Sequence, residues 1–285
     1  MAELRVPITI SNALLTPLWP NLLAVRHSLL TFATAYTDGR QPSRPTLFLI
    51  LFSMNIENND AKRAWQIVCH TNVNLFLTGK AGTGKTTFLR RLKDEAPKRM
   101  VGLAPTGIAA INAGGSTIHS FFQLAFGPYI PGTHYSKESF KLTKRKIKMI
   151  RSLDLIVIDE VSMVRADLLD HVDAVLRRCR ASGEPFGGVQ MLLIGDLQQL
   201  SPVAKDEEWA LLSKYYDSPY FFSSNALKRT YYATIELTHI YRQTDPAFID
   251  LLNRVRNGQA DAHTLTQLNS RYIPNFTPAP KDGYI

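Results

Sequence analysis

The feature that most constrains this chain is a glycine-rich stretch at residues 79–86, which fits the pattern G-x-x-x-x-G-K-[ST]. Glycines let backbone N–H groups turn inward around phosphate oxygens, and the N-terminus of a following helix adds the positive end of its dipole. An apolar run at 74–78 precedes the stretch and a helical pattern at 85–94 follows it. Because this is the strand–loop–helix context in which the pattern acts, we predict a phosphate-binding loop rather than a plain glycine-rich turn.

The side chains of this loop predict a nucleotide bound together with magnesium. Lys85 would reach the β- and γ-phosphates as a point charge, and the Thr86 hydroxyl would ligate Mg²⁺. The predicted nucleotide-binding residues are Gly79, Lys80, Ala81, Gly82, Thr83, Gly84, Lys85, Thr86 and Thr87.

Short apolar runs alternate with amphipathic helical patterns through most of the chain. After the run at 74–78, further strand candidates lie at 100–104, 154–158, 191–194 and 234–237. Runs that are apolar at successive positions are typical of strands buried on both faces, and helices between them indicate parallel connections. With right-handed crossovers, the predicted fold is α/β: a doubly wound, mainly parallel sheet with helices on both faces.

Two acidic residues, Asp159 and Glu160, directly follow the strand candidate at 154–158. Open α/β sheets bind ligands at the carboxyl ends of their strands. Asp159 would hold Mg²⁺ through its water shell, and Glu160 would accept a proton from the attacking water. The alternative is a pair of acids in a solvated loop, which the phosphate-binding loop in the same chain disfavours.

Two further loops, at 195–202 and 241–243, also follow predicted strands. In the first, a side-chain amide would sense the γ-phosphate or orient the attacking water. In the second, Arg242 would stabilise charge in the transition state. Taken alone, a polar loop and a solvated arginine remain the simpler interpretations of these segments.

Three segments concern a polymeric partner. Residues 104–107 offer small and hydroxyl side chains that suit a phosphate backbone, and 117–122 adds rings that would either stack on bases or pack in the core. Residues 137–151 carry seven basic residues and one acid. Apolar side chains interrupt this run at helical spacing, which favours a solvated helix face over direct contact with nucleic acid.

Composition and charge narrow the class of protein. The 285 residues carry a net charge of +9, which suits a polyanionic partner but is also found in ordinary basic proteins. Two cysteines, Cys69 and Cys179, provide neither a disulfide framework nor zinc-ligand spacing, so a reducing compartment is expected. The longest unbroken apolar run, 47–52, is far shorter than the roughly 20 residues of a membrane span, so no membrane association is expected.

Residues 1–53 differ in composition from the rest of the chain. They contain no lysine and are interrupted by five prolines. The composition changes abruptly at Met54, so we expect 1–53 to be an extension outside the core and Met54 to be the true start. The alternative is an organellar transit peptide, which an arginine-rich, acid-poor segment superficially resembles.

The motifs, in their order, resemble those of the Pif helicases, in the RecD-like branch of helicase superfamily one. The matching stretches are 76–87 (FLTGKAGTGKTT), 104–110 (APTGIAA), 116–122 (STIHSFF), 155–164 (LIVIDEVSMV), 194–203 (IGDLQQLSPV) and 237–243 (LTHIYRQ). The Asp-Glu-Val-Ser, Gly-Asp-x-x-Gln-Leu and Tyr-Arg-Gln motifs together are far more specific than the phosphate-binding loop alone.

This resemblance implies a RecA-like P-loop ATPase domain of a motor that uses ATP and Mg²⁺. Such a motor translocates 5′ to 3′ on single-stranded DNA and opens duplex or forked DNA, in repair, recombination, or telomere and replication maintenance. The resemblance makes Gln199 and Arg242 γ-phosphate contacts, which join Lys85, Asp159 and Glu160 as catalytic residues. On the DNA side it places Pro105, Thr106, Gly107, His119, Ser120 and Phe121.

The resemblance also implies a domain plan and a setting. We expect a first RecA-like domain at 54–243, a connecting helix and linker at 244–282, and the start of a second RecA-like domain at 283–285. On this plan the chain would hold nucleotide without being a complete motor. We expect a monomer, located in the cytoplasm with the nucleoid if bacterial, or in the nucleus or mitochondrion if eukaryotic. Two other classes stay open: a P-loop ATPase acting on a protein, and an inactive nucleotide-binding fragment.

Overall fold

The computed structural model of the chain describes residues 60–132, 142–270 and 272. The expected extension at 1–53, the start at Met54 and the expected second-domain residues at 283–285 lie outside the described residues. The first part of the basic segment, 137–141, lies outside them as well.

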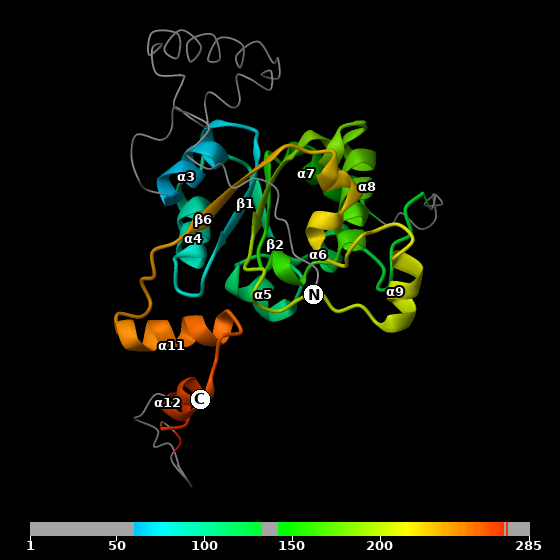
Figure 1. The fold of residues 1–285 in the computed structure, drawn as a ribbon. Helices are drawn as coiled ribbons and strands as arrows, with labels where there is room; N and C mark the ends of the chain where they lie inside the picture. Colours follow the sequence, from blue (N-terminus) through cyan, green and yellow to red (C-terminus); the bar gives the residue numbers. More distant parts are fainter. Residues whose placement is uncertain (1–59, 133–141, 271, 273–285) are drawn as a thin grey trace, which may run out of the picture. The chain divides into compact units, whose positions relative to one another are not determined.

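The described strands form one six-stranded sheet in which every pairing is parallel, which confirms the predicted α/β class (Figure 1). The strands, with their bounds, are β1 Asn74–Gly79, β2 Met100–Ala104, β3 Ser116–Thr117, β4 Leu155–Ile158, β5 Gln190–Ile194 and β6 Tyr232–Leu237. Their order across the sheet is β3-β2-β4-β5-β1-β6. This order places β1, and the loop that follows it, between β5 and β6.

The central strands are the most apolar and the most buried. Every residue of β4 and β5 is buried, as their unbroken apolar runs predict. Leu75 of β1 is in register with Leu192 of β5 on one side and with Ala233 of β6 on the other. This register fixes which loops meet at the carboxyl edge of the sheet.

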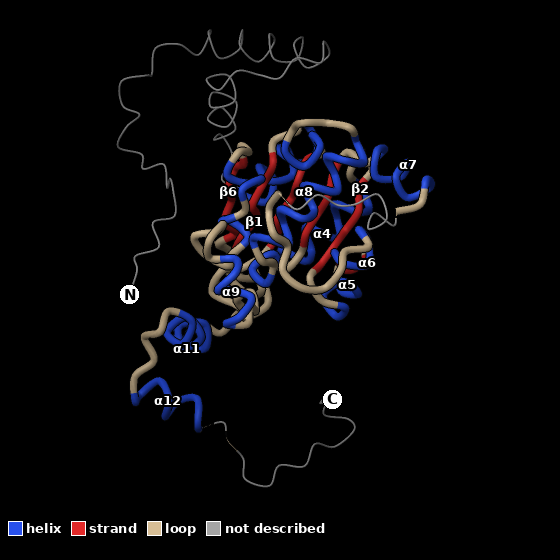
Figure 2. Tube along the Cα trace, turned by 90° about the vertical axis from the view of Figure 1, so that its right-hand side faces the viewer, coloured by secondary structure: helices blue, strands red, loops and turns tan. Residues whose placement is uncertain are grey.

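Helices cover both faces of the sheet. Figure 1 shows α3 and α4 on one side and α7 and α8 on the other, and Figure 2 shows the strands of the sheet side by side. The α-helices are α3 Asp60–His70, α4 Lys85–Glu95, α5 Gly107–Asn112, α6 Ile118–Phe122, α7 Lys144–Ser152, α8 Ala166–Arg180, α9 Asp206–Leu212, α10 Asn225–Lys228, α11 Pro246–Arg256 and α12 Ala262–Asn269. The 3-10 helices in the described part of the chain are η3 Val161–Met163, η4 Pro185–Gly188 and η5 Phe221–Ser223.

Two local features depart from the sequence prediction. The two-residue strand β3 was not predicted, because two residues are too few to show a periodicity. Residues 118–122 form α6, whose N-terminal N–H group at Ser120 is capped by the Thr117 hydroxyl.

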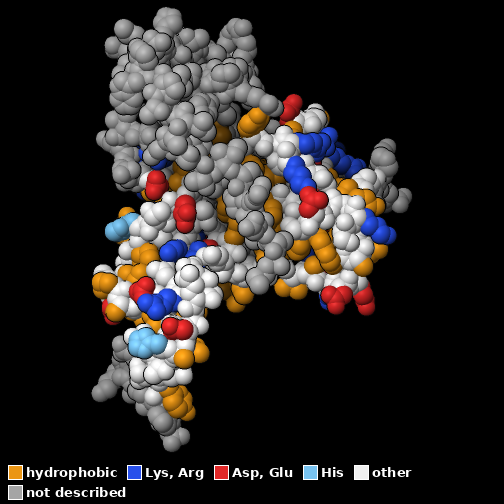
Figure 3. Space-filling view, viewed as in Figure 1, with side chains coloured by type: hydrophobic (Ala, Val, Ile, Leu, Met, Phe, Trp, Pro, Cys, Tyr) orange, Lys and Arg blue, Asp and Glu red, His pale blue; other side chains and the backbone are white. Residues whose placement is uncertain are grey.

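Charged side chains are distributed unevenly over the described surface. In Figure 3 acidic side chains gather where α9 lies, and its first turn holds Asp206, Glu207 and Glu208. Basic side chains gather over the end with α7 and α8. In α7 the side chain of Ile150 is buried while Lys144 and Lys148 are exposed, which agrees with a solvated basic face. Among the described residues, no helix combines the length and apolarity needed to cross a membrane.

Candidate active site

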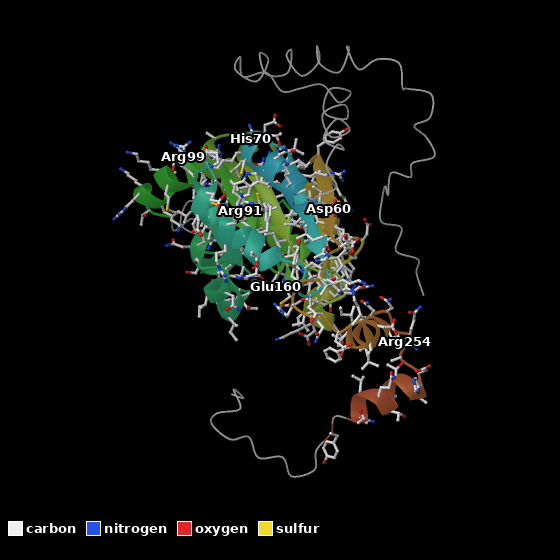
Figure 4. All side chains as sticks on the ribbon, turned by 90° about the vertical axis from the view of Figure 1, so that its left-hand side faces the viewer. Asp60, His70, Arg91, Arg99, Glu160 and Arg254 are labelled. Carbon is white, nitrogen blue, oxygen red and sulfur yellow. The ribbon has the colours of Figure 1, made fainter. Side chains whose placement is uncertain are left out.

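The strand order brings four loops together at the carboxyl edge of the sheet. The phosphate-binding loop follows β1, and its neighbours follow β5 and β6. Asp159 and Glu160 follow β4, which pairs with β5. Figure 4 shows Glu160 at the end of the sheet opposite His70 and Arg99, on the side where Arg254 of α11 lies. The predicted catalytic residues therefore lie at one edge.

The phosphate-binding loop depends on glycine at two positions. Gly79 has φ +151° and Gly82 has φ +80°, in the region that side chains disfavour. A Cβ on Gly79 would lie 2.6 Å from the carbonyl oxygen of Leu237. A Cβ on Gly82 would lie 2.7 Å from the Cβ of Arg242. The glycines thus permit both the turn of the loop and the close approach of the segment after β6.

Lys85 lies at the start of α4 and folds back into the loop. Its Nζ donates to the carbonyl oxygens of Gly79 at 2.5 Å and Lys80 at 3.0 Å. Burial lowers the pKa of Lys85, and the nearby carboxylates of Asp196 and Glu160 partly offset this effect. The ammonium group is therefore held where phosphate oxygens would replace the two carbonyls as its partners.

Asp159 and Glu160 are two adjacent acidic residues that directly follow the end of β4. The Asp159 carboxylate accepts a hydrogen bond from the Glu160 N–H at 3.0 Å. Burial raises the pKa of Asp159, and the Glu160 N–H and Lys85 partly oppose it. Burial, followed by the charge of Asp159, raises the pKa of Glu160. A carboxylate with a raised pKa is a stronger base, which suits Glu160 to accept a proton.

The oxygen donors near the loop fit magnesium. Thr86 is exposed at the start of α4, and the carboxylate of Asp159 lies at the end of β4. The described residues contain no cluster of three or more His, Cys, Asp or Glu that could hold a metal. Mg²⁺ is commonly bound by one or two protein oxygens together with phosphate oxygens and water, and Thr86 with Asp159 matches that donor set.

Asp196 is the buried centre of the loop after β5. Its side chain is 2% exposed, and it accepts from the Gln198 N–H at 3.1 Å and from Gln199 Nε2 at 3.2 Å. Both terminal nitrogens of the Arg256 guanidinium donate to the same carboxylate, with Nη2 at 2.8 Å from Oδ1. Burial alone would raise the pKa of Asp196, but the hydrogen bonds from Arg256 and Gln198 outweigh it and lower the pKa. Asp196 is therefore held as a carboxylate rather than free to act as a base.

The segment after β6 contacts the phosphate-binding loop directly. The Tyr241 N–H donates to the carbonyl oxygen of Gly82 at 2.8 Å. Arg242 follows it with an exposed side chain, so its guanidinium is available to a ligand.

The residues predicted on the DNA side lie at the other end of the same edge. Pro105, Thr106 and Gly107 follow β2, and His119 and Ser120 lie in α6 after the neighbouring strand β3. Three strand spacings separate β2 from β1, which is about 14 Å. Gly107 is exposed with open space around it, and the Thr106 hydroxyl caps α5 by accepting from the Ala109 N–H.

Phe121 does not lie on this surface. It is 4% exposed, belongs to the main hydrophobic core and packs edge-on against Phe122. The ring at 121 is therefore a core residue and does not offer a face to a base, so the expectation for this residue is wrong. Phe126 offers such a face instead: it is 89% exposed and stacks on His119 with ring centres 5.0 Å apart.

Sequence reasoning missed Phe126, Asn253 and Arg256. Asn253 and Arg256 lie in α11, where the Asn253 side chain accepts a hydrogen bond from Lys80 Nζ at 2.8 Å. Their spacing of three residues on an amphipathic helix indicates that both side chains lie on the same face of the helix. The sequence does not indicate which loops that face contacts.

A parallel six-stranded sheet with a phosphate-binding loop after β1 and an acidic pair after β4 defines the RecA-like class of P-loop NTPase domains. The chain belongs to one family within it, the PIF1-like helicases, whose family match covers residues 56–266. This finding confirms the family resemblance predicted from the motifs.

Named relatives agree with this assignment. The ATP-dependent DNA helicase PIF1 of Saccharomyces cerevisiae (strain YJM789) is 36% identical over 219 residues, which are 74% of this chain and 24% of that protein. The human ATP-dependent DNA helicase PIF1 is 37% identical over 201 residues, covering 69% of this chain and 29% of its own length. The chain thus spans about a quarter of the length of these relatives.

Solved structures match the fold closely. The Pif1 helicase from Bacteroides in complex with ADP-AlF3 and single-stranded DNA superposes with a TM-score of 0.74 at 42% identity, over 79% of this chain and 52% of that one. A structure of two coordinating Pif1 helicases at forked double-stranded DNA gives a TM-score of 0.72 at 44% identity, over 76% and 53% of the two chains.

Proposed function

We propose that this chain is the ATPase domain of a DNA helicase, which couples ATP hydrolysis to 5′ to 3′ movement on single-stranded DNA and to duplex unwinding. One observation carries the proposal: the loops after β1, β4, β5 and β6 meet at one sheet edge and bring five chemically matched residues to it. These residues are Lys85, Asp159, Glu160, Gln199 and Arg242. Relatives at 36–37% identity are ATP-dependent DNA helicases, which supports the same reading.

In the proposed mechanism the phosphate-binding loop orients ATP and Lys85 neutralises the β- and γ-phosphates. Thr86 and Asp159 would hold Mg²⁺, which would neutralise phosphate charge when bound. Glu160 takes the proton from the attacking water, a role for which its raised pKa suits it. Gln199 contacts the γ-phosphate. Arg242 stabilises the negative charge that develops as the bond between the γ-phosphorus and the bridging oxygen of the departing ADP breaks.

DNA is proposed to bind at the β2–β3 end of the same edge. The open backbone at Pro105–Gly107 suits phosphate contacts, and the exposed Phe126–His119 stack offers a face for a base. Nucleotide and DNA would then bind at two places on one sheet edge, linked by β4 and β5. Relatives solved with single-stranded DNA and at forked double-stranded DNA support this partner class.

The proposed setting follows from the same family. We assign the activity to DNA repair, recombination, or telomere and replication maintenance, in a chain that acts as a monomer. The compartment would be that of the DNA it serves: the nucleoid-containing cytoplasm in a bacterium, or the nucleus or mitochondrion in a eukaryote.

The test is ATP hydrolysis by the 285-residue chain with and without a single-stranded oligonucleotide, with Lys85→Ala as the control for contaminating ATPase. Stimulation of hydrolysis by the oligonucleotide is the expected result. An equal rate of hydrolysis with and without the oligonucleotide would favour the class of ATPases that act on a protein. Tight ATP binding with no hydrolysis, with or without DNA, would favour a nucleotide-binding fragment.

A further inference from the structure

Arg256, in the last turn of α11, makes a buried ion pair with a residue 60 positions earlier in the chain. Its Nη2 donates to Asp196 Oδ1 at 2.8 Å and its Nη1 donates to Oδ2 of the same carboxylate. The arginine side chain is 19% exposed and the aspartate 2%. Two parallel charge-assisted hydrogen bonds in a water-poor site hold both groups in a fixed orientation.

The same carboxylate also holds a residue of the proposed ATPase site. Asp196 Oδ2 accepts from Gln199 Nε2 at 3.2 Å, and Oδ1 accepts from the Gln198 N–H. Arg256 and Gln199 therefore share one acceptor oxygen. A change in the position of Arg256 would therefore displace the Asp196 carboxylate and, with it, the side chain of Gln199.

A second contact joins the same face of α11 to the phosphate-binding loop. Asn253, three residues before Arg256, accepts a hydrogen bond from Lys80 Nζ at 2.8 Å. Positions three apart lie on the same side of a helix. One face of α11 thus contacts both the loop after β1 and the loop after β5.

We propose that Arg256 is a positioning residue of the nucleotide site, which acts through Asp196 to orient Gln199. This inference rests on the proposed function and adds a link between α11 and the nucleotide. It predicts that α11 distinguishes a nucleoside triphosphate from a diphosphate, because Gln199 is proposed to contact the γ-phosphate, which a diphosphate lacks.

The experiment compares the affinities of fluorescent ADP and a fluorescent non-hydrolysable ATP analogue for the 285-residue chain. Arg256→Met should weaken binding of the ATP analogue by about 10-fold, within the usual range of coupling between sites, and change binding of ADP by less than about 3-fold. Arg256→Lys should restore part of the preference for the triphosphate. Arg254→Met is the matched control, because Arg254 pairs with Asp250 on the exposed side of the same helix. It should leave both affinities unchanged.

The double variant Arg256→Met/Asp196→Asn tests whether Arg256 acts through Asp196. If it does, removing the Asp196 carboxylate as well adds no further loss, so the double variant should bind the ATP analogue about as tightly as Arg256→Met alone. Losses that add up would show that Arg256 does not act through Asp196 and would overturn the inference. If Arg256→Met lowers both affinities equally, or neither, Arg256 has only a structural role and the inference is wrong. If Arg256→Met does not fold, the same comparison in Arg256→Lys decides, and an unchanged preference for the triphosphate overturns the inference. If the unmodified chain binds neither nucleotide, the proposed function itself falls and the inference falls with it.

Discussion

The backbone N–H of Tyr241 donates to the carbonyl oxygen of Gly82 over 2.8 Å, which ties the segment after β6 to the phosphate-binding loop. The contact brings Arg242 so close that a Cβ on Gly82 would lie 2.7 Å from the Cβ of Arg242. The phosphate-binding loop and the arginine proposed to act on the bound phosphate are therefore positioned by one another. The absence of a side chain at Gly82 therefore permits both the turn of the phosphate-binding loop and the close approach of Arg242.

We expect Gly82→Ala to impair nucleotide binding with only a modest loss of stability. The new methyl group meets Arg242 and sits on a backbone with φ +80°, and such strain costs about 1–3 kcal/mol. The strain is relieved by displacement of the segment after β6, so ATP affinity should fall by at least about 10-fold. Gly183→Ala is the control, because nothing lies within 4 Å of a Cβ there. Fluorescence titration of ATP and thermal melting check both effects, and equal ATP affinities in the two variants would contradict the argument.

Lys85→Ala should abolish ATP binding or hydrolysis while the fold survives. The ammonium group donates to the loop carbonyls of Gly79 and Lys80, whereas the buried side chains of Leu75 and Leu77 pack β1. Circular dichroism should therefore match that of the unmodified chain, and isothermal titration should detect no ATP binding. Unchanged ATP affinity would remove the assignment of this loop to phosphate.

Glu160→Gln should separate nucleotide binding from hydrolysis. Glutamine keeps the size of the side chain but cannot take a proton from water, and loss of a general base typically costs about 10²- to 10⁴-fold in rate. ATP and Mg²⁺ should still bind, because Lys85, Thr86 and Asp159 remain. Single-turnover hydrolysis and equilibrium binding measure the two effects.

The contrasting variant is Asp159→Ala, which should weaken Mg²⁺-dependent ATP binding itself. Hydrolysis at the unmodified rate in Glu160→Gln would show that the base lies elsewhere. Asp196 is then a poor substitute, because Arg256 pairs with both of its oxygens and lowers its pKa.

The sequence predicted the parts of the site that local patterns determine. Short apolar runs located β4 and β5 to within a residue, since strands buried on both faces need continuous apolar sequence. The loop motif was found because it directly follows the apolar run of β1, and the acids at 159 and 160 because they directly follow β4. Family resemblance, rather than local pattern, supplied the roles of Gln199 and Arg242.

Long-range pairings were beyond the reach of the sequence. Arg256 and Asp196 are 60 positions apart, and nothing in either segment indicates the other. The exposed ring of Phe126 was likewise missed, because the sequence does not separate a buried aromatic residue from an exposed one in or just after a short helix. Only packing shows that Phe121 belongs to the core and Phe126 does not.

Acidification should destabilise the fold through His171. This residue is 8% exposed and stacks on Tyr129, and burial, with a further contribution from the charge of His119, lowers its pKa to about 4. In the unfolded chain the pKa is about 6.5, so the unfolded state binds more protons between pH 4 and pH 6.5 and stability falls as pH falls through that window. At 1.36 kcal/mol per pKa unit, His171 should remove about 2 kcal/mol of the free energy of unfolding between pH 7 and pH 5.

The measurement is urea unfolding at pH 7 and pH 5 for the unmodified chain and for His171→Phe. Phenylalanine keeps an aromatic ring against Tyr129 and cannot be protonated. Its free energy of unfolding should therefore depend less on pH over this interval. An identical pH dependence in the two proteins would mean that His171 does not titrate differently on unfolding.

Phe126→Ala should weaken binding of single-stranded DNA without destabilising the protein. Stacking of a base on an aromatic ring is worth about 1–3 kcal/mol, so the dissociation constant should rise about 5- to 150-fold. The ring is almost fully exposed and contacts His119 at the surface, so the melting temperature should change little. Fluorescence anisotropy with a labelled oligonucleotide measures the affinity.

Phe121→Ala makes the comparison decisive, because the two phenylalanines are five positions apart yet differ in burial. Removing a core phenylalanine typically costs about 3–5 kcal/mol, so this variant should melt at a much lower temperature. At a temperature where it remains folded, its DNA affinity should stay close to that of the unmodified chain, since its ring packs on Phe122. The opposite pattern, with DNA affinity lost in Phe121→Ala and kept in Phe126→Ala, would return the stacking role to the core ring and require α6 to open when DNA binds.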